Sequence, residues 1–267
     1  MIGSSTLPLL RFSLFADVSH GMSTRHGGVS AGPFTSLNMG YSTADSEANV
    51  RRNRRRFLEA VGATTAISAR LTHGNQVTVL RASDSADLSL EKRPVRSGSD
   101  HEEQVFGTDG VLSDITGLHV LMTFADCVPI LVADRRRGVI GAAHAGWRGT
   151  ASGMASHLIR AMQDSFGCDP SDIIAGIGPS IGPCCYTVAE EVVAAFASRG
   201  SEPVLVRNGA TRLDLWATNE RQLQAAGASA SAIENLRVCT GCNVDTYFSH
   251  RAEGGLTGRL ALCIGKS

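Results

Sequence analysis

The chain of 267 residues has no excess charge of either sign, and this excludes two classes of partner. It carries 25 lysines and arginines against 25 aspartates and glutamates, so its formal net charge is zero. A balanced chain has no general electrostatic attraction to nucleic acid or to an anionic membrane surface. We therefore expect neither as a partner.

Long hydrophobic runs and export signals are also missing. No apolar run approaches the roughly 18 residues that a membrane-spanning helix needs. Residues 1–21 have no basic leading segment, and Pro8, Arg11 and Asp17 interrupt their apolar stretches, which does not fit a signal peptide. The seven cysteines are an odd number in a long chain without a secretory signal, so a disulfide framework is not expected. These absences predict a cytoplasmic protein.

Internal repeats and linkers are absent as well, so we expect a single domain over residues 1–267. Helix and strand patterns alternate irregularly along it. Capping and periodicity predict helices at about 46–61, from 150 to the glycine at 167, at 188–198 and at 215–227. They also predict a strand, a tight turn and a strand at 67–82, and an apolar strand at 118–125. Residues 83–104 are expected to form an exposed polar loop. The mixture predicts an α+β fold in which mixed or antiparallel sheets carry helices on their outer sides.

Two metal-ligand residue types, Cys127 and His144, flank a segment with the pattern of a β-hairpin. A polar turn containing three arginines separates two short apolar runs. If the turn is centred between Arg136 and Arg137, Cys127 falls opposite Gly146. His144 then lies on the same face, diagonal to Cys127, where two side chains can converge. A slip of one residue would send one of them to the opposite face.

The spacing of Cys127 and His144 leaves three interpretations open. The cysteine is a thiolate nucleophile activated by the histidine, as in a cysteine hydrolase. Alternatively, both residues bind a metal ion and a third ligand is missing, because a catalytic zinc usually has three protein ligands and one open position. In the third interpretation they are a buried thiol and a satisfied histidine in the core.

The remaining cysteines carry weaker signals. Cys239 and Cys242 form a Cys-x-x-Cys pair without a second half-site, which is weak evidence for structural zinc. Cys184 and Cys185 are adjacent, and adjacent cysteines seldom bind one metal ion together. Buried thiols are the default expectation for all four.

Seven motifs together change the relative weight of the three interpretations of Cys127 and His144. In order they are THGNQV, GTDGVLSD, ADCVPILVAD, AAHAGWRGT, GIGPSIGPCCY, CTGCNVDTYFSHR and GLTGR. They resemble the family called multicopper polyphenol oxidases, or laccase-domain proteins, from about Thr24 to the C-terminus. The resemblance implies a sandwich of two mixed β-sheets flanked by helices (α-β-β-α). It also implies one zinc ion held by His73, Cys127 and His144, which supplies the missing third ligand.

The family resemblance further implies chemistry on purine nucleosides. Its members phosphorolyse adenosine, inosine, guanosine and methylthioadenosine to the base and ribose 1-phosphate, and can deaminate adenosine. One branch is linked to the editing of peptidoglycan precursors, and the older label is copper-dependent polyphenol oxidase. The eight histidines of this chain are scattered and include no His-x-His pair, so multicopper oxidation is the weakest hypothesis. Zinc is therefore the expected cofactor, with copper as the alternative metal.

Five side chains have expected roles in this chemistry. Cys127, His144 and Asp109 are the expected catalytic residues, and Asp109 is expected to bind ribose or to handle a proton. Arg25, in a glycine-rich loop, and Arg148, just before a helix, are the candidates for binding phosphate. The competing role for each arginine is a structural salt bridge. The expected partners are a purine nucleoside and phosphate, and the sequence makes no prediction of oligomeric state.

Overall fold

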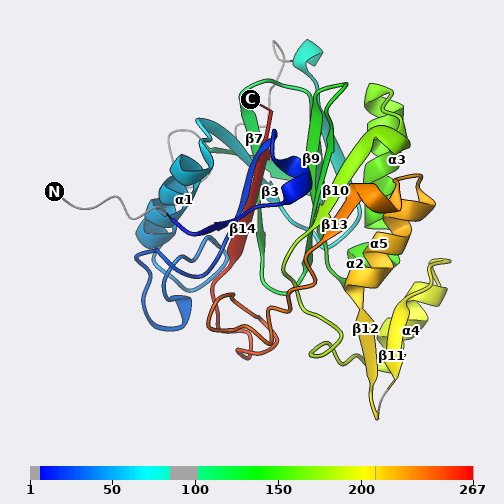
Figure 1. Ribbon diagram of the computed structural model, residues 1–267. Coiled ribbons are helices and arrows are strands. Elements are labelled where there is room, and N and C mark those ends of the chain that lie inside the picture. Colours follow the sequence, from blue (N-terminus) through cyan, green and yellow to red (C-terminus); the bar gives the residue numbers. More distant parts are fainter. Residues whose placement is uncertain (1–6, 85–101, 208, 267) are drawn as a thin grey trace.

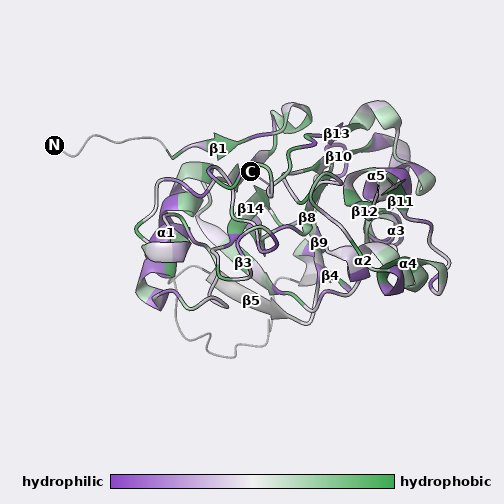
Figure 2. Ribbon diagram, turned by 90° about the horizontal axis from the view of Figure 1, so that it is seen from below, coloured by the Kyte–Doolittle hydropathy of each residue, from purple (hydrophilic) through white to green (hydrophobic). Residues whose placement is uncertain are grey.

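The computed structural model describes residues 7–84, 102–207 and 209–266, and it arranges them in four layers (Figure 1). Helix α1 (Glu47–Val61) covers one six-stranded sheet, and helices α3 (Met154–Phe166) and α5 (Leu215–Ala225) cover the other. The two sheets face each other between these helices, as the view from below also shows (Figure 2). The predicted α-β-β-α sandwich is confirmed.

The first sheet, next to α1, has the strand order β1-β2-β14-β7-β3-β5. Its strands are β1 (Leu9–Leu10), β2 (Ser19–Ser23), β3 (Thr65–Arg70), β5 (Glu102–Phe106), β7 (Leu118–Phe124) and β14 (Leu260–Gly265). Strand β14 is antiparallel to β2 and β7, whereas β3 is parallel to β7 and β5. The sheet is therefore mixed, as expected.

The second sheet has the order β13-β10-β8-β9-β6-β4 and is also mixed. Its strands are β4 (Val77–Leu80), β6 (Gly110–Ser113), β8 (Val128–Asp134), β9 (Val139–Ala145), β10 (Ile173–Ile177) and β13 (Ile233–Asn235). Strands β11 (Val204–Arg207) and β12 (Thr211–Asp214) form a separate two-stranded ribbon beside α4 (Glu190–Ala197) (Figure 1). Short 3₁₀ turns lie at Ser13–Phe15, Gly32–Phe34, Ala82–Asp84, Pro170–Asp172 and Ala230–Ala232.

Three hydrophobic cores hold the four layers together. Along β7, Leu121 packs with α1 while Val120 and Met122 point between the sheets. Along β8, Leu131 points between the sheets, and Ile130 packs toward the helices on the other side. Each such side chain stabilises the fold by about 1.5–3 kcal/mol when fully buried. Burial on both faces explains why these strands are continuously apolar rather than alternating.

Most of the predicted helices form as expected. Helix α1 begins directly after Ser46, whose side chain makes no capping hydrogen bond, and stops at Gly62, whose φ of 85° suits a residue without a side chain. Helices α4 and α5 also match their predictions. The single helix expected from 150 is instead two helices, α2 (Trp147–Ala151) and α3. Gly153, with φ of 76°, interrupts it because the left-handed region cannot continue a right-handed helix.

The β8–β9 hairpin has the register predicted from its sequence. Asp134 pairs with Val139 and Pro129 pairs with His144, so the turn is centred between positions 136 and 137. Cys127 directly precedes β8 and therefore stands opposite Gly146. The diagonal placement of Cys127 and His144 follows from this register.

The strand, turn and strand expected at 67–82 form, but the two strands belong to different sheets. Strand β3 lies in the first sheet and β4 in the second, so residues 71–76 cross between the sheets. This crossing brings His73 to the edge where the β8–β9 hairpin opens. Most of the polar loop expected at 83–104 lies outside the described residues. None of the helices in the described ranges combines the length and hydropathy needed to cross a membrane.

Candidate metal centre

Three side chains from separate segments converge beside the open end of the β8–β9 hairpin. The ligand atoms of His73, Cys127 and His144 all lie within 4.8 Å of one another. The rings of His73 and His144 meet edge to face, with centroids 4.9 Å apart. His144 is buried, Cys127 is half-buried and His73 is exposed. The structure thus brings together the three residues that the family resemblance implies as metal ligands.

Asp109 holds both histidines in place. Its fully buried carboxylate accepts hydrogen bonds from the backbone N–H groups of Thr72, His73 and Gly74, at 3.2, 2.9 and 2.8 Å. It also accepts from the Thr72 hydroxyl at 2.5 Å and lies 3.3 Å from Nδ1 of His144. These contacts leave no face of the carboxylate open to a ribose. They favour a positioning role for Asp109, because a carboxylate on one ring nitrogen directs the other nitrogen toward a metal ion.

Burial and neighbouring charged groups shift the pKa values of the side chains at the centre. Burial alone would raise the pKa of Asp109, but hydrogen bonds from His144, Thr72 and Gly74 outweigh it and hold the pKa well below its usual range. Burial lowers the pKa of His144, whereas Cys127 and Asp109 raise it more strongly, to about 9. Burial and the neighbouring His144 lower the pKa of His73. The Cys127 sulfur and the Asp109 carboxylate are thus the two neighbours that favour the protonated form of His144.

The donor set fits zinc. Zinc prefers imidazole nitrogen and thiolate sulfur, and a catalytic zinc has three protein ligands and one open position. Gly146 keeps that space free, because a Cβ there would lie 2.9 Å from the Cys127 sulfur and 3.8 Å from ring atoms of both histidines. His73, Cys127 and His144 would hold the ion.

Backbone strain is concentrated next to the three donors. His73 and Asp126 have φ angles of 61° and 81°, in the left-handed region that side chains usually avoid. The Asp126 carboxylate is anchored by the hydroxyls of Thr240 and Ser249, at 2.6 and 2.7 Å, and by the backbone N–H of Arg251 at 2.6 Å. Such positions persist when surrounding contacts over-determine them, and they cluster at functional sites.

Two cavities meet at the candidate metal centre, and both are lined by His73 and Cys127. The larger is a cleft of about 730 Å³, within the usual range for small-molecule sites. The smaller measures about 90 Å³. Polar side chains of the cleft include Tyr41, Ser68, Arg70, His144, His250 and Arg259, while Asp126, Trp147, Arg148 and Tyr186 line the smaller cavity. The centre is therefore reachable from two sides.

Arg148 lines the smaller cavity, and Arg259 is one of three arginines that line the cleft; both are close enough to the centre to lower the pKa of His73. Arg148 lies over the Trp147 ring, with its guanidinium carbon 4.1 Å from the ring centroid. Arg259 donates to the carbonyls of Thr257 and Gly258 at 2.9 Å, and burial lowers its pKa against the opposing effects of Asp126 and Cys127. Sequence reasoning did not select Arg259 for a role. Its only signal was its place at the end of the GLTGR motif.

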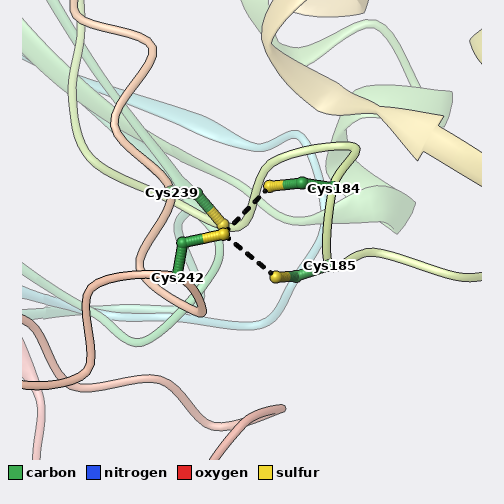
Figure 3. Close-up of side chains that lie close together, drawn as sticks. All are labelled: Cys184, Cys185, Cys239 and Cys242. Atoms are coloured by element: carbon green, nitrogen blue, oxygen red, sulfur yellow. Dashed lines mark hydrogen bonds between the residues drawn. The ribbon is translucent and has the colours of Figure 1, made fainter.

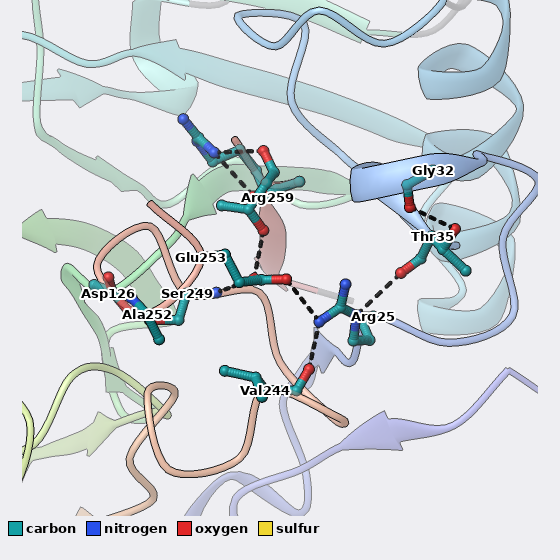
Figure 4. A network of polar contacts seen from close by, with 11 residues as sticks. Arg25, Gly32, Thr35, Asp126, Val244, Ser249, Ala252, Glu253 and Arg259 are labelled. Carbon is teal, nitrogen blue, oxygen red and sulfur yellow. Dashed lines mark hydrogen bonds and ion pairs between the residues drawn. The ribbon is translucent and has the colours of Figure 1, made fainter. Parts of the chain in front are cut away.

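Arg25 lies outside the residues that line either cavity. Its guanidinium donates to the Thr35 carbonyl at 3.0 Å and to the Val244 carbonyl, and forms a 3.1 Å ion pair with Glu253 (Figure 4). It also stacks 4.5 Å from the centre of the Phe248 ring. These contacts join the loop after β2 to the loop before β14. They favour the structural alternative for Arg25, and phosphate binding by this residue stays a prediction.

Replacing Arg25 by Ala is expected to lower the free energy of unfolding by about 2–3 kcal/mol, because it leaves the partly buried Glu253 without its cation. Thermal unfolding should show a Tm lower by several degrees. Arg25→Lys keeps the charge but not the planar fork, so an intermediate Tm is expected. An unchanged Tm together with a weakened affinity for phosphate would show that Arg25 binds the anion instead.

Comparisons with known proteins agree with the motifs. The family model of the multi-copper polyphenol oxidoreductase laccase matches residues 19–267. The purine nucleoside phosphorylase YlmD of Geobacillus stearothermophilus is 39% identical over 259 residues, covering 94% of this chain and 91% of that protein. The crystal structure of YlmD from Geobacillus stearothermophilus matches with a TM-score of 0.87 and 36% identity, over 99% of this chain and 98% of the other.

A further relative is named for a different activity. The adenosine deaminase RL5, from an unknown prokaryotic organism, is 36% identical over 165 residues, which cover 60% of this chain and 63% of that protein. The family model spans nearly the whole sequence, and the overall fold is that of YlmD. The chain therefore belongs to the multi-copper polyphenol oxidoreductase laccase family.

Proposed function

We propose that this protein is a zinc-dependent enzyme of purine nucleosides, which phosphorolyses adenosine, inosine, guanosine and methylthioadenosine and also deaminates adenosine. The observation that carries the proposal is the His73, Cys127 and His144 cluster, which lies between two cavities that each contain an arginine. The activities for which two relatives are named, purine nucleoside phosphorylase and adenosine deaminase, support it.

The larger cleft is the proposed nucleoside site. Its volume of about 730 Å³ can hold a nucleoside, and His250 and Arg259 line it together with the metal ligands. In phosphorolysis a phosphate oxygen forms a bond to the anomeric carbon of the ribose. The bond from that carbon to the purine nitrogen breaks, and the base leaves with the electron pair and takes up a proton. The products are the free base and ribose 1-phosphate.

Each group around the centre has a distinct part in this proposal. When bound, zinc supplies a Lewis acid that stabilises negative charge on an oxygen or nitrogen ligand of the substrate. Asp109 keeps the His73 loop and the His144 ring in position to bind it. Arg148 and Arg259 hold phosphate charge beside the centre through charge-assisted hydrogen bonds. Deamination needs water in place of phosphate, so it does not require this anion site.

The first test is a product analysis with adenosine. With phosphate present, we expect adenine and ribose 1-phosphate, and the amounts should rise with phosphate concentration. Without phosphate, we expect only inosine from the deamination reaction. If neither product forms in a protein with full zinc content, the proposed function is wrong.

The same residues also fit a second candidate function, a cysteine hydrolase. Cys127 lies beside His144, and Asp109 contacts Nδ1 of His144, so a cysteine, a histidine and an aspartate adjoin one another as they do in a catalytic triad. In that case Cys127 attacks the substrate and His73 has no direct part. An editing activity on peptidoglycan precursors would use the same pair. His73 therefore separates the candidates, because only the metal hypothesis needs it as a ligand.

A further inference from the structure

Four cysteines gather at a second place, apart from the three donors of the metal centre. The sulfur atoms of Cys184, Cys185, Cys239 and Cys242 all lie within 4.8 Å of one another (Figure 3). The Cys242 sulfur is 3.3 Å from that of Cys184 and 3.4 Å from that of Cys185. Cys239 is buried, whereas Cys184 and Cys242 are exposed. Cys185 is half-buried, so the expectation of buried thiols is confirmed only for Cys239.

The fold builds this cluster from two loops that follow paired strands. Strands β10 and β13 are parallel neighbours, so the loops that leave them emerge side by side. The pairing continues beyond the strands, because Ser180 N–H donates to Val238 and Thr240 N–H donates back to Ser180, at 3.1 and 3.0 Å. Cys239 therefore lies beside the loop that carries Cys184 and Cys185, although 54 or more positions separate them in sequence.

Local geometry then turns all four sulfurs toward one point. Cys185 and Tyr186 both donate their backbone N–H to the Gly182 carbonyl at 3.0 Å, which closes a single helical turn around the adjacent cysteines. Gly241 lies between Cys239 and Cys242. A Cβ there would lie 3.1 Å from Cβ and 3.2 Å from the sulfur of Cys185, so the glycine allows the two loops this close approach.

We propose that Cys184, Cys185, Cys239 and Cys242 bind a second zinc ion, which is structural. Four thiolates at about 2.3 Å from one ion form a tetrahedron whose edges measure about 3.8 Å. The sulfurs already lie near these separations, before any ion draws them together. Four thiolates form a closed zinc site without an open position, and such sites stabilise folds rather than perform chemistry. An iron–sulfur cluster would need wider separation, because its cysteines bind different iron atoms.

The backbone around Cys239 supports a thiolate ligand. The Gly182 N–H donates to its sulfur at 3.2 Å. A hydrogen bond to a ligand atom orients it and stabilises its negative charge, which is the usual role of contacts around a metal site. Cys184 and Cys242, on the exposed side, give an ion a path from solvent. The second half-site that the Cys239-x-x-Cys242 pair lacked is thus the adjacent pair 184–185.

The position of this site suggests what the zinc stabilises. Ile181 and Tyr186, on either side of the adjacent cysteines, line the smaller cavity of the metal centre. Thr240, between Cys239 and Cys242, donates to the strained Asp126 at 2.6 Å. Between β10 and α4 the chain has no regular element to hold this wall. The second ion therefore fastens the loops that shape the cavity.

The main competitor is a disulfide, since Cys184 or Cys185 lies close to Cys242. A disulfide would remove two thiols and leave only two ligands in the cluster. After the protein is denatured with a chelator under nitrogen, the zinc hypothesis predicts that a thiol reagent titrates all seven cysteines. A titration two thiols short would overturn the proposal in favour of the disulfide.

The decisive experiment is metal analysis of the purified full-length protein. We expect two zinc equivalents per chain in the wild type, and the loss of one in the double variant Cys184→Ser/Cys242→Ser together with a lower Tm. Cys168→Ala, a buried cysteine outside both clusters, is the matched control and should keep two. A double variant that retains two equivalents would overturn the proposal.

A spectroscopic measurement covers the case in which the double variant does not fold. Wild-type protein produced with Co²⁺ should show thiolate-to-metal charge transfer for five thiolates and the ligand-field bands of tetrahedral cobalt. Cys127→Ser should remove only the one-thiolate contribution and leave the spectrum of a four-thiolate site. If that variant shows no four-thiolate spectrum, the second site does not exist. Loss of nucleoside activity with this spectrum intact would concern the proposed function alone.

Discussion

Replacing Cys127 by Ser is expected to remove one bound zinc ion per chain and to lower kcat/KM for purine nucleosides at least about a thousandfold. An alcohol is a far poorer zinc ligand than a thiolate, and two imidazoles alone hold the ion weakly. Loss of a Lewis acid costs several kcal/mol in the transition state, and each 1.36 kcal/mol is a factor of ten in rate. Metal analysis and product assays on the same preparation measure both effects.

The matched control is Cys168→Ala, which changes a buried cysteine outside both clusters. It should leave the zinc held by His73, Cys127 and His144 in place. His73→Ala is a second test variant. Only the metal hypothesis predicts that His73→Ala lowers bound zinc and kcat/KM as much as Cys127→Ser does. A folded Cys127→Ser protein with full zinc content would contradict the assignment of the ligands.

Alkylation distinguishes the two roles considered for Cys127, a metal ligand or a catalytic nucleophile. A zinc-bound thiolate is tied up, so iodoacetamide should label Cys127 slowly until a chelator removes the metal. A catalytic thiolate paired with His144 would react quickly in the loaded enzyme. Peptide mapping identifies which cysteine is labelled. Rapid labelling of Cys127 with zinc still bound would favour the cysteine hydrolase.

Replacing Arg148 by Ala is expected to raise the phosphate concentration needed for phosphorolysis about ten- to a hundredfold. One charge-assisted hydrogen bond contributes roughly 1.5–3 kcal/mol, which converts to that range of affinity. The Arg148 side chain packs on Trp147 at the smaller cavity, and within the described residues it has no ion pair that would hold it as a structural cation. Adenosine deamination should be largely unaffected because water carries no charge.

Arg25→Ala is the matched control for Arg148, since its guanidinium is engaged by Glu253 away from both cavities. The phosphate dependence of ribose 1-phosphate release, with inosine formation as the internal reference, distinguishes the outcomes. A change only in Arg259→Ala would place the anion in the larger cleft. If Arg148→Ala lowers both activities equally, Arg148 supports the fold or the nucleoside instead of phosphate.

Much of the local structure could be predicted from the sequence. The register of the β8–β9 hairpin followed from a polar turn between two apolar runs, and it placed Cys127 and His144 on one face. The bounds of helix α1, after Ser46 and before Gly62, followed from its periodicity and its terminal glycine. In each case the relevant interactions connect residues close in the chain, so the residue pattern that produces them can be recognised in the sequence.

The two clusters of donors show where local patterns fail. His73 comes from a segment that crosses between the sheets, and spacing gave no reason to place it beside Cys127; only the resemblance of its motif did. The adjacent cysteines 184–185 and the Cys239-x-x-Cys242 pair each looked too weak for a metal site. Parallel pairing of β10 and β13 joins them, and strand order in a sheet cannot be inferred from either segment alone.

Arg25 and Arg148 likewise could not be distinguished from the sequence alone. Both have glycines as near neighbours in the sequence, and the residues around them offered the same two roles, phosphate binding or a structural salt bridge. The sequence by itself determined the family, the layered α+β class and the hairpin at the centre, because these depend on periodicity, turns and motifs. Only the tertiary structure decided that Glu253 engages Arg25 while Arg148 lies at a cavity. Such contacts depend on how distant segments pack, and no short stretch of sequence encodes that packing.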